Sequence, residues 1–345
     1  MICWSSSDTL KGNEVRLLVL TNNPKRASFR QRIAVHLETL RQHGIESEVA
    51  VFPPGAAARK RLFKLASDFD AVFLQKRRLN LFDARVLRRY ARQIIYDFDD
   101  AVMYSPSDPE RKSRSHAWPF RRTVKLADLV IAGNAYLAEH AGRFNSNVSV
   151  LPTGLNTKAY SPGTKPQEDG KIRLVWIGSK STLKYLAGIR DALEQTGRLH
   201  DNVVLRIICD DFFDLEAMAV EKCLWARKTQ YQDLAGSDIG LAPLPEDPFT
   251  RGKCGFKILQ YAAAGLPTVA SPVGVNAQYV QGGVTGLLAS ETDEWVECLC
   301  KLVADRQKRQ QMGANAGEFV RPFDLAAIGG QLAELILACG ADLKS

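Results

Sequence analysis

Short and almost uninterrupted apolar stretches recur along this chain, and each is followed by a segment with helical periodicity. Examples are residues 15–21, 71–75, 129–132 and 204–209. A strand that is apolar on both faces must be buried on both faces, as in a parallel sheet covered by helices. Alternation of such strands with helices predicts a right-handed, doubly wound parallel sheet.

The alternation runs twice along the 345 residues, a length that usually holds two domains. The strands predicted in the first half are 15–21, 47–52, 71–75, 94–97, 129–132 and 148–151. Those predicted in the second half are 173–177, 204–209, 239–244, 268–271 and 286–288. Helices are predicted between them, including single helices over 28–44 and 182–196, and a stretch rich in Pro and Gly at 152–170 is typical of a linker.

These elements suggest the domain organisation. We expect a polar, disordered tail at 1–14, a first domain at 15–160, a second domain at 161–322 and a C-terminal segment at 323–345. Ligands of open α/β sheets bind beyond the carboxyl ends of the strands. Two such domains facing each other would therefore place a ligand in the cleft between them.

The net charge of +8 is unevenly distributed. Residues 1–162 carry 26 Lys and Arg against 15 Asp and Glu, a charge of +11, and the remainder has a charge of −3. A field of this sign favours anionic partners, namely nucleic acid, an anionic lipid surface or a phosphate-bearing substrate. An ordinary solvated basic surface has the same composition, so charge alone does not choose among them.

Other features argue against several classes of protein. The seven cysteines are odd in number and scattered, without a CxxC pair or a Cys/His cluster, which disfavours zinc and indicates reduced thiols. No run of about 18 apolar residues, the length that crosses a bilayer, is present. No secretory signal is recognisable before residue 15. We therefore expect a cytoplasmic protein.

The stretch at 248–276 has the composition of a phosphate-binding loop. Gly252 and Gly255 precede a predicted helix that begins near Phe256, and Lys253 and Lys257 bracket its start. The first turn of a helix presents unpaired N–H groups and the positive end of the helix dipole. Two lysines at such a start predict a cradle for a diphosphate.

The end of this stretch, residues 260–269, reads QYAAAGLPTV and resembles the donor-site segment of glycosyltransferase family 4. That segment usually ends in Glu-Ala-x-Ala-x-Gly-x-Pro-Val-Val. The resemblance implies the GT-B fold, in which two Rossmann-like, doubly wound parallel-sheet domains face each other across a cleft. It also places Lys253, Gly255, Phe256 and Lys257 on the phosphate-facing loop of the donor site.

Two acids that the family carries in this segment are absent here. The family has a glutamate at the position of Gly252, where it touches the donor sugar, and a second at the position of Gln260, where it holds the donor ribose. Gln260 can accept a hydrogen bond from a hydroxyl through its amide oxygen.

Two further matches support the resemblance. Gly178 and Ser179 stand where the family has Gly-Arg, and Lys184 keeps a lysine that the family has five residues later. The resemblance implies that all three contact the donor diphosphate. Residues 151–162 are similar to the interdomain segment of the family, whose C-terminal helix crosses back onto the first domain.

The first domain is expected to hold the acceptor. Asp97, Asp99 and Asp100 lie at the carboxyl end of a predicted strand, where close carboxylates repel one another and raise the pKa of at least one. Asp99 or Asp100 would orient or deprotonate an acceptor hydroxyl, although helix capping and salt bridges would explain the same cluster. Arg30 or Arg32, assigned to the acceptor side, could contact a phosphate of the acceptor or of the donor, although two solvent-exposed arginines would explain the same pattern.

The function implied by the resemblance is transfer of a sugar from a nucleotide-sugar to a hydroxyl of a carbohydrate or lipid-linked acceptor, with retention of configuration. Lys184 and Lys257 would neutralise the leaving diphosphate, with no metal or other cofactor and no nucleic-acid partner. The product would be a cell-surface polysaccharide or a glycolipid. Basic segments at 58–61 and 111–122 resemble membrane-facing patches, so peripheral contact with the anionic inner face of the membrane is also expected.

Two alternatives remain open from the sequence. The missing acids suggest a nucleotide-sugar-binding protein with little or no turnover. The basic first half suggests a module that binds a polyanion or a membrane surface and has no enzymatic role.

Overall fold

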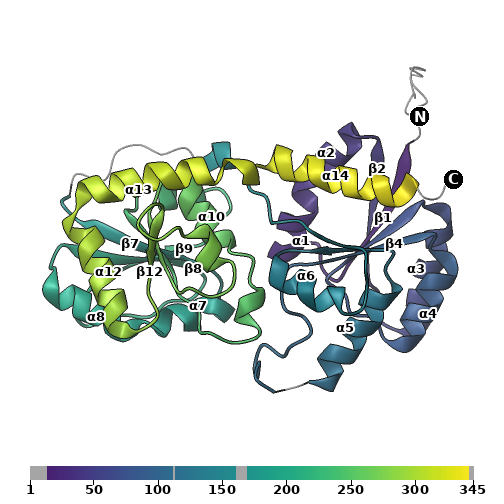
Figure 1. Ribbon diagram of the computed structural model, residues 1–345, viewed down its shortest axis with the longest axis horizontal. Coiled ribbons are helices and arrows are strands. Elements are labelled where there is room, and N and C mark those ends of the chain that lie inside the picture. Colours follow the sequence, from purple (N-terminus) through teal and green to yellow (C-terminus); the bar gives the residue numbers. More distant parts are fainter. Residues whose placement is uncertain (1–13, 112, 161–168, 342–345) are drawn as a thin grey trace.

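The structure, a computed structural model, describes residues 14–111, 113–160 and 169–341. It contains two six-stranded sheets that lie side by side, each flanked by helices (Figure 1). Every strand pair in both sheets is parallel. This confirms the predicted pair of doubly wound α/β sheets. The proposed boundary at 160/161 adjoins a segment, 161–168, that lies outside the described residues, as do residues 1–13 of the expected tail.

The first sheet has the strand order β2-β1-β3-β4-β5-β6. Its strands are β1 (Val15–Thr21), β2 (Ile45–Val51), β3 (Ala71–Gln75), β4 (Gln93–Phe98), β5 (Leu129–Ala132) and β6 (Val148–Val150). Successive residues of β1 enter different cores: Leu18 and Leu20 pack on one face of the sheet, and Leu17 and Val19 on the other. Burial of both faces explains why this strand is apolar throughout.

The helices of the first unit are α1 (Ala27–Arg32), α2 (Leu37–Gln42), α3 (Ala56–Lys64), α4 (Leu81–Tyr90), α5 (Arg114–Leu126) and α6 (Ala135–Gly142). Helix α14 (Leu325–Ala341) runs back from the second sheet to the first (Figure 1). Its residues Ile328, Leu332 and Ile336 share a core with Leu17 and Val19. The chain therefore connects the two units twice, once before the second sheet and once after it.

The second sheet has the order β12-β11-β10-β7-β8-β9. Its strands are β7 (Ile172–Ile177), β8 (Val203–Cys209), β9 (Ala219–Leu224), β10 (Ile239–Ala242), β11 (Thr268–Ala270) and β12 (Gly286–Leu288). Its helices are α7 (Lys180–Ala187), α8 (Arg190–Leu199), α9 (Gln230–Ala235), α10 (Phe256–Ala263), α11 (Asn276–Tyr279), α12 (Thr292–Ala304) and α13 (Arg306–Phe319). As in the first sheet, neighbouring residues Trp176 and Ile177 of β7 belong to cores on opposite faces.

Three elements differ from the sequence prediction. The helix predicted at 28–44 is divided into α1 and α2, because Ile33 leaves the helical region (φ −131°, ψ −53°) before a 3₁₀ turn at Ala34–His36. The helix predicted at 182–196 is divided into α7 and α8 around Gly188. The sequence does not predict β9, an edge strand whose residues are exposed or half-buried.

Candidate functional site

A cavity of about 600 Å³ lies between the two units, at the carboxyl ends of strands from both sheets. Its wall follows β4 in the first sheet and β7, β8 and β10 in the second. Of the residues singled out from the sequence, those in the wall are Arg30, Asp99, Asp100, Gly178, Ser179, Lys253, Gly255, Phe256, Lys257 and Gln260. The described residues Arg32, Asp97 and Lys184 are not part of the wall.

Helix α10 begins at the cavity wall. Gly255, its N-cap residue, has a left-handed backbone (φ 63°, ψ 19°), and a Cβ there would lie 2.8 Å from the ring of Tyr279. Both facts favour glycine. The amides of Phe256 and Lys257 are in the first turn, where N–H groups have no partner within the helix. The helix therefore offers unpaired donors and its positive dipole end to the cavity.

Lys257 adds a positive charge at this helix start. Its Nζ lies 4.7 Å from the centroid of the Trp176 ring, and a Cβ on Gly178 would lie 2.9 Å from that Nζ and 2.3 Å from the ring. Glycine at 178 therefore makes room for this pair. Within the described part of the chain, no acidic side chain pairs with Lys257. Burial, together with repulsion from Lys253, lowers its pKa to about 8.

The predicted pair Ser179 and Lys184 lies on α7. Ser179 is the N-cap residue, and its side chain and that of Thr182 form a capping box. It lines the cavity at the start of a second helix. Lys184 lies in the last turn, is exposed, and has its ammonium 5.3 Å from the centroid of the adjacent Tyr185 ring. The structure does not bring Lys184 into the cavity wall, although the next residue, Tyr185, lines it.

Gln260 is buried in the cavity wall. Its Nε2 donates to the hydroxyl of Tyr160 at 2.8 Å and lies 3.4 Å from Oε1 of Gln230. Its Oε1 accepts no hydrogen bond from a described residue. This amide oxygen is therefore available to a hydroxyl, as the sequence suggested.

The loop before α10 packs directly on the first unit. A Cβ on Gly252 would lie 2.6 Å from Cβ of Ala101, so a side chain at this position would push the two units apart. The thiol of Cys254 donates to the carbonyl oxygen of Asp99 at 3.1 Å, next to Gly133, where a Cβ would lie 2.4 Å from Sγ. These contacts hold the loop across the interface. Gly252 itself is buried there and is not in the cavity wall.

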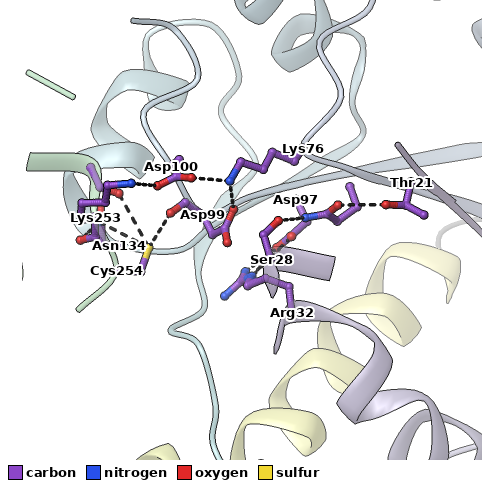
Figure 2. A network of polar contacts seen from close by, with 12 residues as sticks. Thr21, Ser28, Arg32, Lys76, Asp97, Asp99, Asp100, Asn134, Lys253 and Cys254 are labelled. Carbon is purple, nitrogen blue, oxygen red and sulfur yellow. Dashed lines mark hydrogen bonds and ion pairs between the residues drawn. The ribbon is translucent and has the colours of Figure 1, made fainter. Parts of the chain in front are cut away.

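Arg32 and Asp97 form a buried ion pair inside the first unit (Figure 2). The side chains are 3% and 1% exposed, and Arg32 also donates to the carbonyl oxygen of Leu151 at 2.7 Å. Burial raises the pKa of Asp97, and the guanidinium opposes that rise. The structure therefore places both residues outside the cavity wall, where they tie α1 to β4.

Asp99 and Asp100 do reach the cavity, and lysines neutralise both. The ammonium of Lys76 lies 2.9 Å from Asp99 and also contacts Asp100, which in turn contacts Lys253 (Figure 2). Burial works to raise the pKa of Asp100, but Lys253 and Lys76 together lower it to about 2. The predicted upward shift in this cluster therefore occurs at Asp97, where burial rather than mutual repulsion is its main cause.

The sequence interpretation missed Lys76, Trp176 and Trp225. Lys76 has a left-handed backbone (φ 56°), which is uncommon for a residue with a side chain, and its position just after a buried strand was the available signal. Trp225 follows the unpredicted β9. Cζ of Arg30 lies over its ring, 5.7 Å from the centroid, so the two residues form a cation–π contact between the units at the cavity wall.

The described ranges contain no group of three or more His, Cys, Asp or Glu that could hold a metal ion. No helix among them is both long and apolar enough to cross a membrane.

Comparison with solved structures identifies the class of fold. HepE from Anabaena, solved in complex with UDP and glucose, superposes with a TM-score of 0.71 at 20% identity and covers 94% of this chain and 100% of that one. WaaG, a glycosyltransferase involved in lipopolysaccharide biosynthesis, gives a TM-score of 0.69 at 16% identity, covering 93% and 99%. The fold is therefore that of the GT-B glycosyltransferases.

The sequence comparisons cover a smaller part of the chain, and they point to the group 1 glycosyltransferases. The family model "Glycosyl transferases group 1" matches residues 226–305. The D-inositol 3-phosphate glycosyltransferase of Corynebacterium aurimucosum is 25% identical over 245 residues, and the match covers 61% of this chain and 57% of that protein. Its counterpart in Nocardia farcinica is 23% identical, with coverage of 57% and 49%. The chain thus spans about half the length of these curated relatives.

Proposed function

We propose that this protein is a glycosyltransferase that moves a sugar from a nucleoside diphosphate sugar to an acceptor hydroxyl. The observation that carries the proposal is the ammonium of Lys257, which has no acidic partner among the described residues and stands beside the open first turn of α10. A diphosphate would supply the missing negative charge and accept hydrogen bonds from the free amides. The UDP complex of HepE supports a nucleotide at such a site.

The same groups would assist the chemistry. As the bond between sugar and diphosphate breaks, negative charge grows on the leaving phosphate, and Lys257 with the amides of Gly255 and Phe256 would neutralise it without rearrangement. In this proposal the cations of the chain perform this part, and no metal is required. The likeness of residues 260–269 to glycosyltransferase family 4 supports retention of configuration at the transferred sugar.

The acceptor side has a basic character that suits an anionic or lipid-linked acceptor. Residues 1–162 have a charge of +11, and the two curated relatives described above are named D-inositol 3-phosphate glycosyltransferases. Trp118 on α5 and Phe82 on α4 are 64% and 48% exposed among arginines. Such a surface supports peripheral contact with an anionic membrane and a role in the synthesis of cell-surface polysaccharide or glycolipid.

The experiment that tests the donor site is a thermal-shift screen against UDP, GDP, ADP and dTDP and their common sugars, without added metal. We expect one nucleoside diphosphate to raise the Tm of the wild type. The same nucleotide should leave the Tm of Lys257→Met unchanged. No response to any nucleotide would refute the donor site and favour the polyanion-binding alternative.

A second candidate is a nucleotide-sugar-binding protein with little or no turnover. The observation that favours it is that two positions with glutamate in glycosyltransferase family 4 are not acidic here. Gly252 is buried against Ala101, and Gln260 offers an amide in place of a carboxylate. Release of nucleoside diphosphate in the presence of acceptor lipid or sugar extracts separates the candidates. Binding without any release would support this second one.

A further inference from the structure

Lys253 links the two units at the cavity wall. It belongs to the loop before α10, yet its Nζ lies 2.9 Å from Oδ1 of Asp100 in the first unit (Figure 2). The other oxygen of that carboxylate is held by Lys76, also of the first unit. The two carboxylate oxygens of Asp100 are therefore bound by two lysines, one from each unit.

The backbone around Lys253 is held independently of this ion pair. Gly252 packs on Ala101, the thiol of Cys254 bonds the carbonyl oxygen of Asp99, and Asn134 Nδ2 donates to the carbonyl oxygen of Lys253 at 3.1 Å. With the backbone fixed on both sides, the side chain of Lys253 can change its ionic partner without movement of the loop.

The proposed diphosphate would be a second anion near Lys253, whose charge is close enough to lower the pKa of Lys257. The proposed diphosphate site at Lys257 and the start of α10 is only a few residues away, and both lysines line the same cavity. Asp100 is the only acidic partner of Lys253 in the described ranges. Because both members of this pair are about a quarter exposed, at 25% and 24%, the pair is held less firmly than a fully buried one.

We propose that Lys253 is a positioning residue that couples the two substrates. A bound diphosphate draws the ammonium of Lys253 away from Asp100, and the freed Oδ1 then accepts a hydrogen bond from the acceptor hydroxyl. Lys76 keeps the other oxygen, so the carboxylate stays ionised and oriented. The inference rests on the proposed function, and it implies that the donor binds before the acceptor.

The test is the donor affinity of Asp100→Asn, measured by isothermal titration with the nucleoside diphosphate found in the thermal-shift screen, UDP being tried first. Without the carboxylate, Lys253 has no partner to leave, so the nucleotide should bind about two- to tenfold more tightly, a range between those of exposed and of buried charged pairs. Turnover should fall. If Asp100 had only a structural role, its replacement would instead weaken donor binding.

Asp99→Asn is the matched control. It removes the same charge from the same cluster, but the ion pair of Asp99 is with Lys76, whereas that of Lys253 is with Asp100. We expect a smaller gain in donor affinity than for Asp100→Asn. Equal gains would mean that removal of any negative charge near the cavity strengthens donor binding, and this would overturn the coupling through Lys253. In the double variant Lys253→Met with Asp100→Asn, the gain from Asp100→Asn should disappear.

The outcomes separate the two proposals. If no nucleoside diphosphate binds the wild type, the proposed function fails. If one binds the wild type but binds Asp100→Asn equally or more weakly, only the coupling fails. Lys253→Met alone gives a readout that does not depend on the folding of the Asp100 variant: it should weaken donor binding, and Lys253→Arg should restore it.

Discussion

Replacement of Lys257 by methionine should stabilise the empty protein while it removes activity. The folded protein lowers the pKa of this ammonium from 10.5 to about 8. At pH 7 the group is charged whether the chain is folded or not, so the folded state carries an electrostatic penalty of at most about 3 kcal/mol. Because the folded pKa is the lower one, the penalty is full below pH 8 and vanishes as pH rises towards 10.5.

The penalty is partly offset by the contact with Trp176. A cation above an aromatic ring is worth about 0.5–2 kcal/mol, and methionine loses it while its stem keeps the packing. The net gain should be about 1–2 kcal/mol, a rise of a few degrees in Tm. Turnover should fall by about 10²–10³, as when one charge-stabilising donor is removed from an active site.

Two assays check this reasoning, namely thermal melting of the empty protein and release of nucleoside diphosphate. Lys301→Met, which removes an exposed lysine of α12, is the control and should change neither. A clear decrease in the Tm of Lys257→Met would show that the ammonium stabilises the fold. Turnover within tenfold of the wild type would refute its role at the diphosphate.

Three further outcomes are expected. Affinity for the nucleoside diphosphate should fall by up to about tenfold per pH unit above pH 8, since only the charged form of Lys257 attracts phosphate; titration calorimetry across that range checks it, and a flat profile contradicts it. Gly252→Ala should lower stability by about 1–3 kcal/mol and open the interface, because its Cβ would meet Ala101 at 2.6 Å; melting and solution scattering measure both, and unchanged values would show that the close contact is dispensable. Lys184→Met should change donor affinity by less than about threefold, as expected for an exposed lysine outside the cavity wall; a tenfold loss in the same titration would show that α7 moves when the donor binds.

The sequence predicts the sheets and the start of α10 well because their signals are local. A strand buried on both faces must be apolar along its whole length, and Gly255 with its flanking lysines lies within five residues of the helix start. The ion pairs could not be predicted in the same way. Arg32 meets Asp97 across 65 residues, and Lys253 meets Asp100 across 153. Nothing local distinguishes a lysine that will face phosphate from one that will face a distant carboxylate.

Glycine at position 252 and the acidic pair Asp99 and Asp100 are connected by geometry. Glycine at 252 lets the backbone approach Ala101 so closely that a Cβ would lie 2.9 Å from its amide nitrogen. That approach brings the residue before Ala101, Asp100, into contact with Lys253 and into the cavity wall. A glutamate at 252 would need the space that Ala101 occupies, so it would displace the loop and the two carboxylates with it. In this arrangement the Asp100 carboxylate of the first unit therefore lies in the cavity wall, and the close contact with Ala101 leaves no room for a side chain at position 252.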